Sequence, residues 1–312
     1  MPLPLLNWVG WREGKQPEVK KIANYTFREL AKEYLQWAQS RRSFRCKKIF
    51  TSQLLDAFSN VPLRRFTTRL VEQFQSERMQ RGNKPATVNR LLATLKHQFT
   101  KAVDWDMVEE ETLKRVRKVK LLEENNRRLR YLSREECQAL IQASDPHLRP
   151  ILITALNTGM RKEEILSLRW DENVDLKHNF ILLDRTKNGE RREVPINATL
   201  RAALQGLTRR LDSPYVFCDP LTGKRYKDVK RSFRSACRRA GIKDFRFHDC
   251  RHTFASQLVM AGADLMTVKE LLGHKTLAMT LRYSHLAPAH RRRAVDLLDA
   301  ALNETRRAQV AP

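Results

Sequence analysis

Glycine and cysteine are both scarce in this sequence, and each scarcity excludes a class of protein. Only 10 of the 312 residues are glycine, and no G-x-x-x-x-G-K-[ST] stretch occurs, which argues against a glycine-rich phosphate loop. The five cysteines are odd in number, scattered along the chain and without a C-x-x-C pair. They indicate free thiols in a reducing cytoplasm rather than a disulfide framework or a zinc ribbon.

Long apolar segments and targeting signals are missing as well. No apolar run approaches the roughly 20 residues that a membrane-spanning helix needs. The start of the chain, from Met1 to Trp8, has neither the basic stretch nor the small-residue cleavage pattern of a secretory signal. We therefore expect a cytoplasmic protein with no membrane partner.

Positive charge, in contrast, is present in large excess. The chain carries 60 Lys and Arg residues against 35 Asp and Glu, a net charge of +25 that both halves of the sequence share. Because the excess is not confined to a tail, most of the chain is suited to face a polyanion, and nucleic acid is the leading partner. Hydrophobic residues make up 41% of the chain, enough for real cores.

Composition and periodicity divide the chain into two domains joined by a linker. The first domain is expected to be helical without strands, beginning at a capping box formed by Thr26 and Glu29. Its later helices are expected at residues 47–58, 67–81 and 86–103. Alternating acidic and basic blocks then indicate a solvated linker. The expected boundaries are 1–22 for a lead-in, 23–106 for the helical domain, 107–130 for the linker, 131–302 for the second domain and 303–312 for a tail.

The second domain is expected to combine helices with a small antiparallel sheet. It opens at a second capping box, Ser133 with Glu136. Two β-prone runs at 180–184 and 192–196 flank Asn188-Gly189, the dipeptide most typical of a tight hairpin. The predicted fold class of the whole chain is therefore mainly α with a small antiparallel β-sheet.

Five short stretches of the second domain carry polar side chains in a definite order. They read TGMRKEEILSL at 158–168, TKNG at 186–189, HDCRHTFAS at 248–256, LLGH at 271–274 and TLRYSH at 280–285. Each stretch alone is weak evidence for a site. In this order and spacing they resemble the tyrosine recombinase family, specifically phage-type integrases with a Xer-like catalytic domain. The resemblance covers nearly the whole second domain, and the first domain resembles the family's helical, SAM-like core-binding domain.

The resemblance implies a role for each matching residue. Tyr283 matches the nucleophile that attacks a DNA phosphodiester, forms a 3′-phosphotyrosyl link and frees a 5′-hydroxyl. Arg161, Arg251 and His274 match the groups that hold the non-bridging phosphate oxygens. Glu164 matches a carboxylate that supports the first of these arginines.

Two further matches complete the catalytic set. Lys187 matches the lysine that protonates the leaving 5′-oxygen, and His248 matches a general base or phosphate contact. Physical chemistry agrees with such an assembly, because a phenol has a pKa near 10 and nearby cations lower that pKa. The same cations stabilise the charge that develops on the phosphate, so the set needs no metal and no cofactor.

The resemblance also implies partners and an overall activity. The chain would be a site-specific DNA recombinase that cleaves and rejoins duplex DNA at recombination sites, as part of a mobile genetic element. It would act as a homotetramer held together through its C-terminal helix, with an accessory DNA-bending protein as a further partner. The few residues before Thr26 are expected to be too short for the arm-binding domain of many phage integrases.

Several alternatives stay open at this stage. His248 and His252 flank Cys250 at a spacing that could suit zinc, but a zinc hydrolase needs a glutamate there and Arg251 would repel a cation. The segment at 291–302, with one apolar side, would pack either on its own domain or on a neighbouring subunit. One basic face of the first domain would either contact DNA phosphates or be solvated. Its residues are Lys84, Thr87, Arg90 and Lys96.

Two other functions compete with recombination. The first is a catalytically lapsed DNA-binding protein or element remnant, which the complete catalytic set disfavours. The second is a metal-dependent nuclease, which the absence of a carboxylate cluster from the sequence disfavours.

Overall fold

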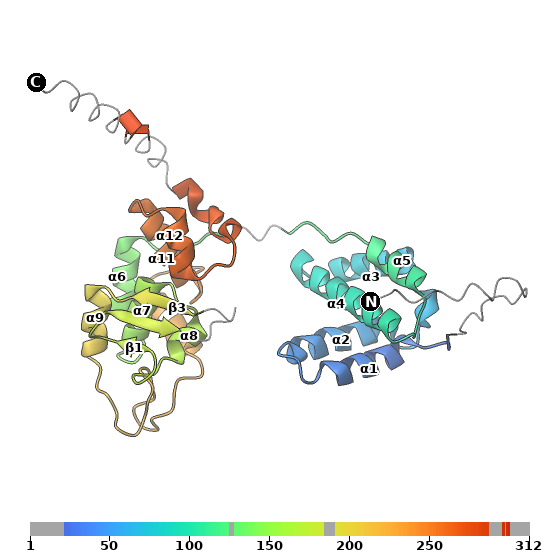
Figure 1. Cartoon of the computed structure of the whole chain (residues 1–312), viewed down its shortest axis with the longest axis horizontal. Coiled ribbons are helices and arrows are strands. Elements are labelled where there is room, and N and C mark those ends of the chain that lie inside the picture. The colour runs from blue at the N-terminus through green and yellow to red at the C-terminus, as the bar shows by residue number, and fades with distance from the viewer. Residues whose placement is uncertain (1–21, 125–127, 184–190, 287–294, 297, 300–312) are drawn as a thin grey trace, which may run out of the picture. The chain divides into compact units, whose positions relative to one another are not determined.

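The computed structural model describes residues 22–124, 128–183, 191–286, 295–296 and 298–299. Contacts divide the chain into two compact units, 1–126 and 127–312, each with a core of its own (Figure 1). Across the described residues the regular structure is mainly helical with one three-stranded sheet, which confirms the expected fold class. Within that part of the chain, no helix is both long and apolar enough to span a bilayer.

The first unit is built from helices around a core of phenylalanines. Its helix α1 begins at the expected capping box, where the Thr26 N–H donates to Glu29 Oε2 at 2.7 Å and the Glu29 N–H donates to Thr26 Oγ1 at 3.4 Å. In the core, the Phe66 ring lies 5.7 Å from that of Phe27 and 4.7 Å from that of Phe99. The elements are α1 (Phe27–Ala38), α2 (Phe44–Phe58), the 3-10 turn η2 (Leu63–Arg65), α3 (Thr68–Gln80), α4 (Pro85–Asp104) and α5 (Glu110–Lys118).

Helix α5 corrects the expectation of a solvated linker over 107–130. It packs against α3 and α4, and its Leu113 and Val116 are 5% and 0% exposed. The charged blocks that indicated a linker are the solvent side of a short amphipathic helix. The two apolar residues that fall on its other side were too few to stand out in the sequence.

The second unit contains the sheet and a larger set of helices. The order β1-β2-β3 is antiparallel, and Ile181 of β2 lies opposite Val194 of β3 with both side chains buried. These two strands are the predicted hairpin strands, whereas the two-residue β1 was not predicted; the Asn188-Gly189 turn lies outside the described residues. The elements are α6 (Arg134–Gln142), α7 (Arg149–Thr158), α8 (Lys162–Leu166), β1 (Val174–Asp175), β2 (Phe180–Leu183), β3 (Arg192–Pro195), α9 (Ala198–Gln205), α10 (Lys230–Arg239), α11 (Asp249–Met260), α12 (Leu265–Leu272), η3 (Leu277–Met279) and η4 (Leu281–Leu286).

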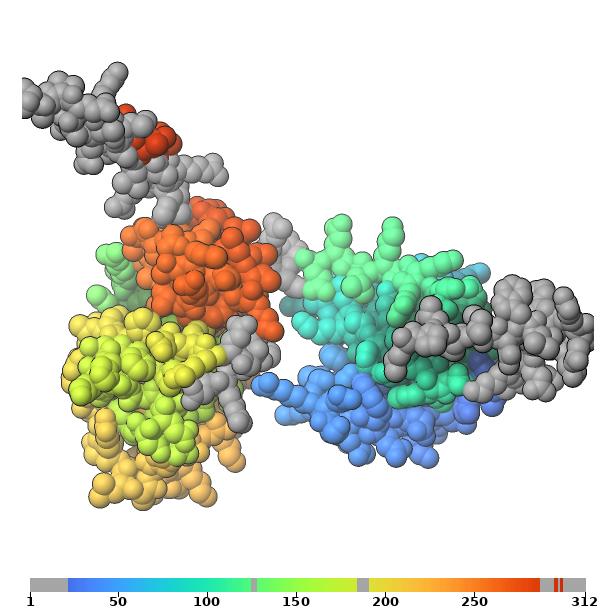
Figure 2. Space-filling model, in the orientation of Figure 1, coloured from blue at the N-terminus to red at the C-terminus, as the bar shows by residue number. Residues whose placement is uncertain are grey.

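Two hydrophobic clusters stabilise the second unit. The larger joins the buried face of the sheet to α6, α7, α9 and α10. The smaller joins α11, α12 and η4, and Tyr283 is one of its members. In Figure 2 the segment from α11 to η4, in orange, sits on the green and yellow body that contains the sheet. Helix α11 links the two, because it packs against α7 as well as α12 and η4.

Candidate active site

The residues singled out by sequence come from four separated elements of the second unit. Arg161 is the N-cap residue of α8, and His248 is the N-cap residue of α11, with Arg251 in that helix's first turn. His274 follows α12 directly after Gly273, and Tyr283 lies in η4. Four of these five residues therefore lie at or beside a helix end, and Tyr283 lies in a 3-10 turn.

A glycine turn joins α7 to the segment that carries Arg161. Gly159 ends α7 with φ +60°, in the left-handed region that favours glycine. A Cβ atom at Gly159 would lie 2.5 Å from Cδ1 of Phe254, so the position also lacks space for a side chain. The chain turns there, Arg161 becomes the N-cap residue of α8, and the Gly159 carbonyl accepts from Arg251 of α11.

Glu164 lies between two arginines. Its Oε1 accepts from Arg161 Nη1 at 2.7 Å, and its Oε2 accepts from the Arg161 N–H at 2.9 Å and from Arg192 Nη2 at 3.0 Å. Burial alone would raise the pKa of Glu164, but the Arg161 N–H and the charge of Arg192 outweigh burial and lower it. The carboxylate is therefore charged at neutral pH and holds the Arg161 fork in one orientation.

Arg251 is 4% exposed and is held by two backbone carbonyls. Its Nη1 donates to the Gly159 carbonyl at 2.8 Å, and its Nη2 donates to the Leu272 carbonyl at 2.6 Å. Burial, with the nearby charge of Arg161, lowers the pKa of Arg251 to about 10. The guanidinium therefore remains protonated at neutral pH while lying away from water, where its charge acts strongly.

Three imidazoles complete the polar surroundings, and all are biased toward the neutral form. Burial, reinforced by the charge of Arg251, lowers the pKa of His248 and lowers that of His274 to about 4. His274 Nδ1 lies 2.9 Å from Oγ1 of the buried Thr280, which fixes the rotation of its ring. His252 has its pKa lowered to about 4 by burial and then by the charge of Arg282.

Tyr283 is 1% exposed, and its phenol is hydrogen-bonded to His252. The distance from Tyr283 Oη to His252 Nδ1 is 2.6 Å, and the ring of His248 lies 5.4 Å from that of His252 in an edge-to-face arrangement. Burial raises the pKa of Tyr283, although Arg282 and Arg251 oppose the shift. Phenol and imidazole are both neutral at pH 7, and the phenol faces an imidazole rather than open solvent in this conformation.

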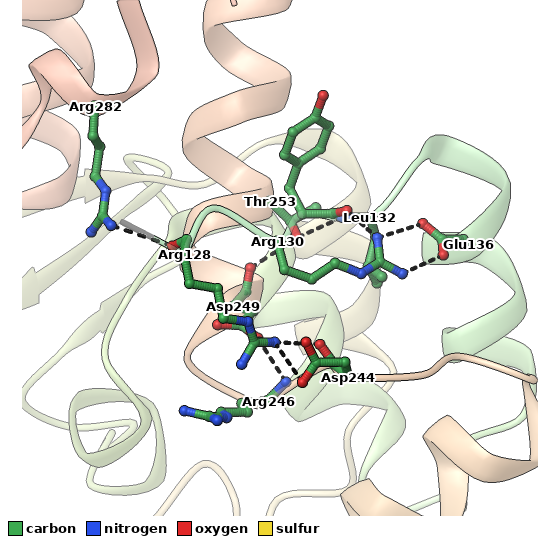
Figure 3. Close-up of polar contacts among 10 residues, drawn as sticks. Arg128, Arg130, Leu132, Glu136, Asp244, Arg246, Asp249, Thr253 and Arg282 are labelled. Carbon is green, nitrogen blue, oxygen red and sulfur yellow. Dashed lines mark hydrogen bonds and ion pairs between the residues drawn. The ribbon is translucent and has the colours of Figure 1, made fainter. Parts of the chain in front are cut away.

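The segment at residues 128–132, just before α6 and called the strap below, contacts the start of α11 (Figure 3). Arg128 Nη2 donates to Asp249 Oδ2 at 3.0 Å, and the Leu132 N–H donates to Thr253 Oγ1 at 3.1 Å. The Arg128 carbonyl accepts from Nη2 of Arg282 at 3.3 Å, one residue before Tyr283 (Figure 3). The strap therefore contacts both the helix that carries two candidate residues and the segment that carries the phenol.

Sequence reasoning missed two side chains of this site and includes one that the structure does not describe. Arg192 entered the sequence analysis as part of a strand and His252 as a member of the spacing that could suit zinc, yet Arg192 contacts Glu164 and His252 contacts Tyr283. Lys187 lies outside the described residues, as does most of the segment at 291–302. The side chains whose spacing could suit zinc lie in different surroundings, because Cys250 belongs to the larger core cluster while His252 contacts Tyr283.

The expected basic face of the first unit also divides in two. Lys84 is exposed at the N-cap of α4, Arg90 is exposed on the helix, and Thr87 is half-buried between them. Lys96 differs, because its Nζ donates to the Val119 carbonyl at 2.5 Å, just past the end of α5. Burial lowers the pKa of Lys96, and its charge already stabilises a helix end within the unit.

Comparison with known proteins identifies the family of this chain. A model of the phage integrase family matches residues 130–290, which include every one of the five motif stretches. The chain belongs to the phage integrase family. The resemblance to tyrosine recombinases is therefore confirmed.

Relatives of this family member include integrases and recombinases of several elements. It is 31% identical to the integrase of Salmonella phage P22 over 60% of the chain and 50% of that protein. It is 33% identical to the shufflon-specific DNA recombinase of Escherichia coli over 73% of the chain and 58% of that protein. It is 30% identical to the tyrosine recombinase XerA of Pyrococcus furiosus over 74% of the chain and 87% of that protein. The chain thus spans between half and six tenths of the length of the first two.

Solved structures share the fold at low sequence identity. A lambda integrase (75–356) dimer bound to a COC′ core site matches with a TM-score of 0.70 at 20% identity, over 82% of this chain and 97% of that one. The Tn1549 transposon integrase in complex with transposon right end DNA matches with a TM-score of 0.71 at 17% identity, over 88% of this chain and 100% of that one.

Proposed function

We propose that this chain is a site-specific DNA recombinase that cleaves and rejoins duplex DNA through a 3′-phosphotyrosyl intermediate on Tyr283. One observation carries the proposal: α11, which carries Arg251 and two imidazoles, packs directly against the segment that holds the Tyr283 phenol, and Arg251 and Arg161 are both held by fixed partners. Recombinases and integrases among the relatives support it.

The proposed first step is a transesterification at phosphorus. Tyr283 Oη forms a bond to the phosphorus, and the bond from phosphorus to the 5′-oxygen breaks. The phenol proton passes to an imidazole, for which His252 lies nearest in this conformation and His248 is the residue that the resemblance implies. Lys187 gives a proton to the leaving 5′-oxygen. Because the phosphodiester is exchanged and not hydrolysed, rejoining is the reverse of the same step and needs no ATP.

Arg161, Arg251 and His274 would hold the non-bridging oxygens. The planar fork of an arginine suits two phosphate oxygens, and both forks are already held by protein partners before DNA arrives. The charge that grows on the phosphate then meets cations that need little rearrangement. Since the phenol is 1% exposed here, a movement of η4 is required to bring it to the phosphate.

Duplex DNA is the proposed substrate, and assembly on DNA as a homotetramer is the proposed working state. A lambda integrase tetramer bound to a Holliday junction is among the solved structures with this fold, at a TM-score of 0.69 and 19% identity. The contact between subunits would involve the C-terminal segment, and an accessory DNA-bending protein would assist. All five cysteines are free thiols, which suits action in the cytoplasm.

A covalent trapping assay on a nicked duplex from the element's own ends tests the proposal. The nick lets the short downstream strand diffuse away after cleavage, so the protein stays attached to DNA and migrates slowly in a denaturing gel. The wild-type chain should be trapped, and Tyr283→Phe should bind the duplex equally well without being trapped. Tyr215→Phe serves as the matched control and should be trapped like the wild type.

The alternatives predict different results from the same assay. A lapsed DNA-binding protein would bind and never become trapped. A metal-dependent nuclease would cut without a covalent product and would stop when EDTA is added, whereas trapping should resist EDTA. Equal trapping of the wild type and Tyr283→Phe would remove Tyr283 as the nucleophile.

A further inference from the structure

Arg192 is a buried cation that the reaction described above does not use. It is the first residue of β3, and its side chain is 7% exposed. Nη2 donates to Glu164 Oε2 at 3.0 Å, and Nη1 donates to the Leu272 carbonyl. Its Nε is buried with no hydrogen-bond partner. An arginine with an unpaired donor in a core is unfavourable, and an apolar side chain would fill this space at lower cost.

Both partners of Arg192 are shared with the proposed phosphate-holding arginines. Glu164 is the carboxylate that also binds Arg161, with Oε1 2.7 Å from Arg161 Nη1. The Leu272 carbonyl is the one that also accepts from Arg251 Nη2 at 2.6 Å. The Arg192 guanidinium is therefore bonded to the two groups that also hold Arg161 and Arg251.

The turn that precedes His274 is shaped around the same side chain. Gly273 has φ +63°, in the left-handed region that favours glycine, and a Cβ built on it would clash with Arg192 Nη1 and lie 3.1 Å from its Cδ. The Arg192 guanidinium therefore lies directly against the backbone at the point where the chain leaves α12. His274 is the next residue, and its position follows from that contact.

Arg192 also holds the start of a strand in place. It lies five residues after Lys187 in sequence, at the point where β3 begins. Opposite it in the sheet is Leu183, the last residue of β2. Because Arg192 is bonded to Glu164 and to the Leu272 carbonyl, the start of β3 is held against α8 and the end of α12.

We propose that Arg192 is a positioning residue, which aligns Arg161 through Glu164 and Arg251 and His274 through the Leu272–Gly273 backbone. This inference rests on the proposed recombinase function. The cluster then acts as one connected unit, in which Arg192 touches no phosphate but sets the geometry of three groups that do.

The test separates chemistry from binding and from folding. Arg192→Lys keeps the charge and loses the fork that reaches two partners, and Arg201→Lys is the matched control, because Arg201 pairs with Asn179 away from the cluster. We expect Arg192→Lys to slow single-turnover formation of the covalent complex about 10- to 100-fold, as small misalignments of catalytic groups do. DNA affinity should change less than about threefold, since Arg192 is not at the surface.

A methylphosphonate at the scissile position provides a readout that a general structural defect would not move. It removes the negative charge that Arg161 and Arg251 hold, so misalignment of those arginines matters less. The difference in rate between the wild type and Arg192→Lys should therefore shrink on this substrate. An equal defect on both substrates, a normal rate, or a parallel loss of DNA binding would each overturn the inference.

A second variant covers the case in which Arg192→Lys fails to fold. Arg192→Met removes the cation and leaves Glu164 paired with Arg161, so the carboxylate keeps a counterion. This variant should fold and bind DNA but cleave slowly, with the same partial rescue on methylphosphonate. Full cleavage by Arg192→Met would overturn the inference. If the wild type itself is never trapped, the proposed function fails and not the role of Arg192.

Discussion

Acid should destabilise the second unit over a pH range that its histidines define. His252 and His274 have folded-state pKa values of about 4, against 6.5 for an unperturbed histidine. An unfolded chain therefore takes up protons that the folded chain refuses as the pH falls below about 6.5. The stability that these neutral imidazoles contribute is fully present above pH 6.5 and is lost as the pH falls toward about 4.

The magnitude follows from the two shifts. At pH 5 each histidine binds about 0.9 more protons in the unfolded state, so the two together give a slope of about 2.4 kcal/mol per pH unit. Both side chains are partly exposed, and screening by water reduces the effect by roughly half. Between pH 7 and pH 5 we expect a loss of about 2 kcal/mol, or about 4–8 °C in the midpoint of thermal unfolding.

Scanning calorimetry of the full chain measures this loss at intervals of half a pH unit. The double variant His252→Gln with His274→Gln removes the titrating groups and should flatten the slope between pH 6.5 and pH 5. The range from pH 7.5 to pH 8.5 is the internal control, because His252 and His274 stay neutral there and the two proteins should run parallel. An unchanged slope in the double variant would refute the claim that nearby arginines and burial keep these imidazoles neutral.

Three further predictions concern other parts of the chain. Glu164→Gln should lower the free energy of unfolding by about 3 kcal/mol, because two guanidiniums lose their shared counterion. The exposed neighbour Glu163→Gln should change it by less than about 0.5 kcal/mol; equal urea unfolding of the two would contradict this account. Leu113→Ala should cost about 2–4 kcal/mol in thermal unfolding, and a negligible cost would mean that α5 is not packed. Arg90→Ala should weaken DNA binding and reduce its salt dependence by about one charge, whereas Lys96→Ala should mainly lower stability; the reverse pattern in binding titrations would assign DNA contact to Lys96.

The features of this fold that could be predicted from sequence are those that depend on residues close together along the chain. The capping boxes at Thr26 and Ser133 and the two strands beside Asn188-Gly189 each depend on residues a few positions apart, and each forms as expected. Helix α5 was not predicted because only two of its three buried residues are apolar, and charged residues dominate the rest of its sequence.

The chemistry of the site was predictable as a set of residue types and much less as a set of contacts. Matching motifs singled out Arg161, Arg251 and Tyr283 as candidates, because the resemblance depends on residue types and their spacing along the chain. The contact of Arg192 with Glu164 joins residues 28 apart, and that of His252 with Tyr283 joins residues 31 apart. No periodicity or cap signals such pairs, because they depend on how α8, β3, α11 and η4 pack in three dimensions.

The central claim is that Tyr283 forms the covalent bond to DNA, and peptide mapping of the trapped complex tests it most directly. After nuclease and trypsin digestion, a nucleotide should remain attached to the peptide that contains Tyr283 and ends at Arg291, linked through a 3′-phosphate. The released DNA strand should carry a 5′-hydroxyl. A nucleotide on a peptide carrying any of the other five tyrosines, or cleaved DNA with no modified peptide, would contradict the account.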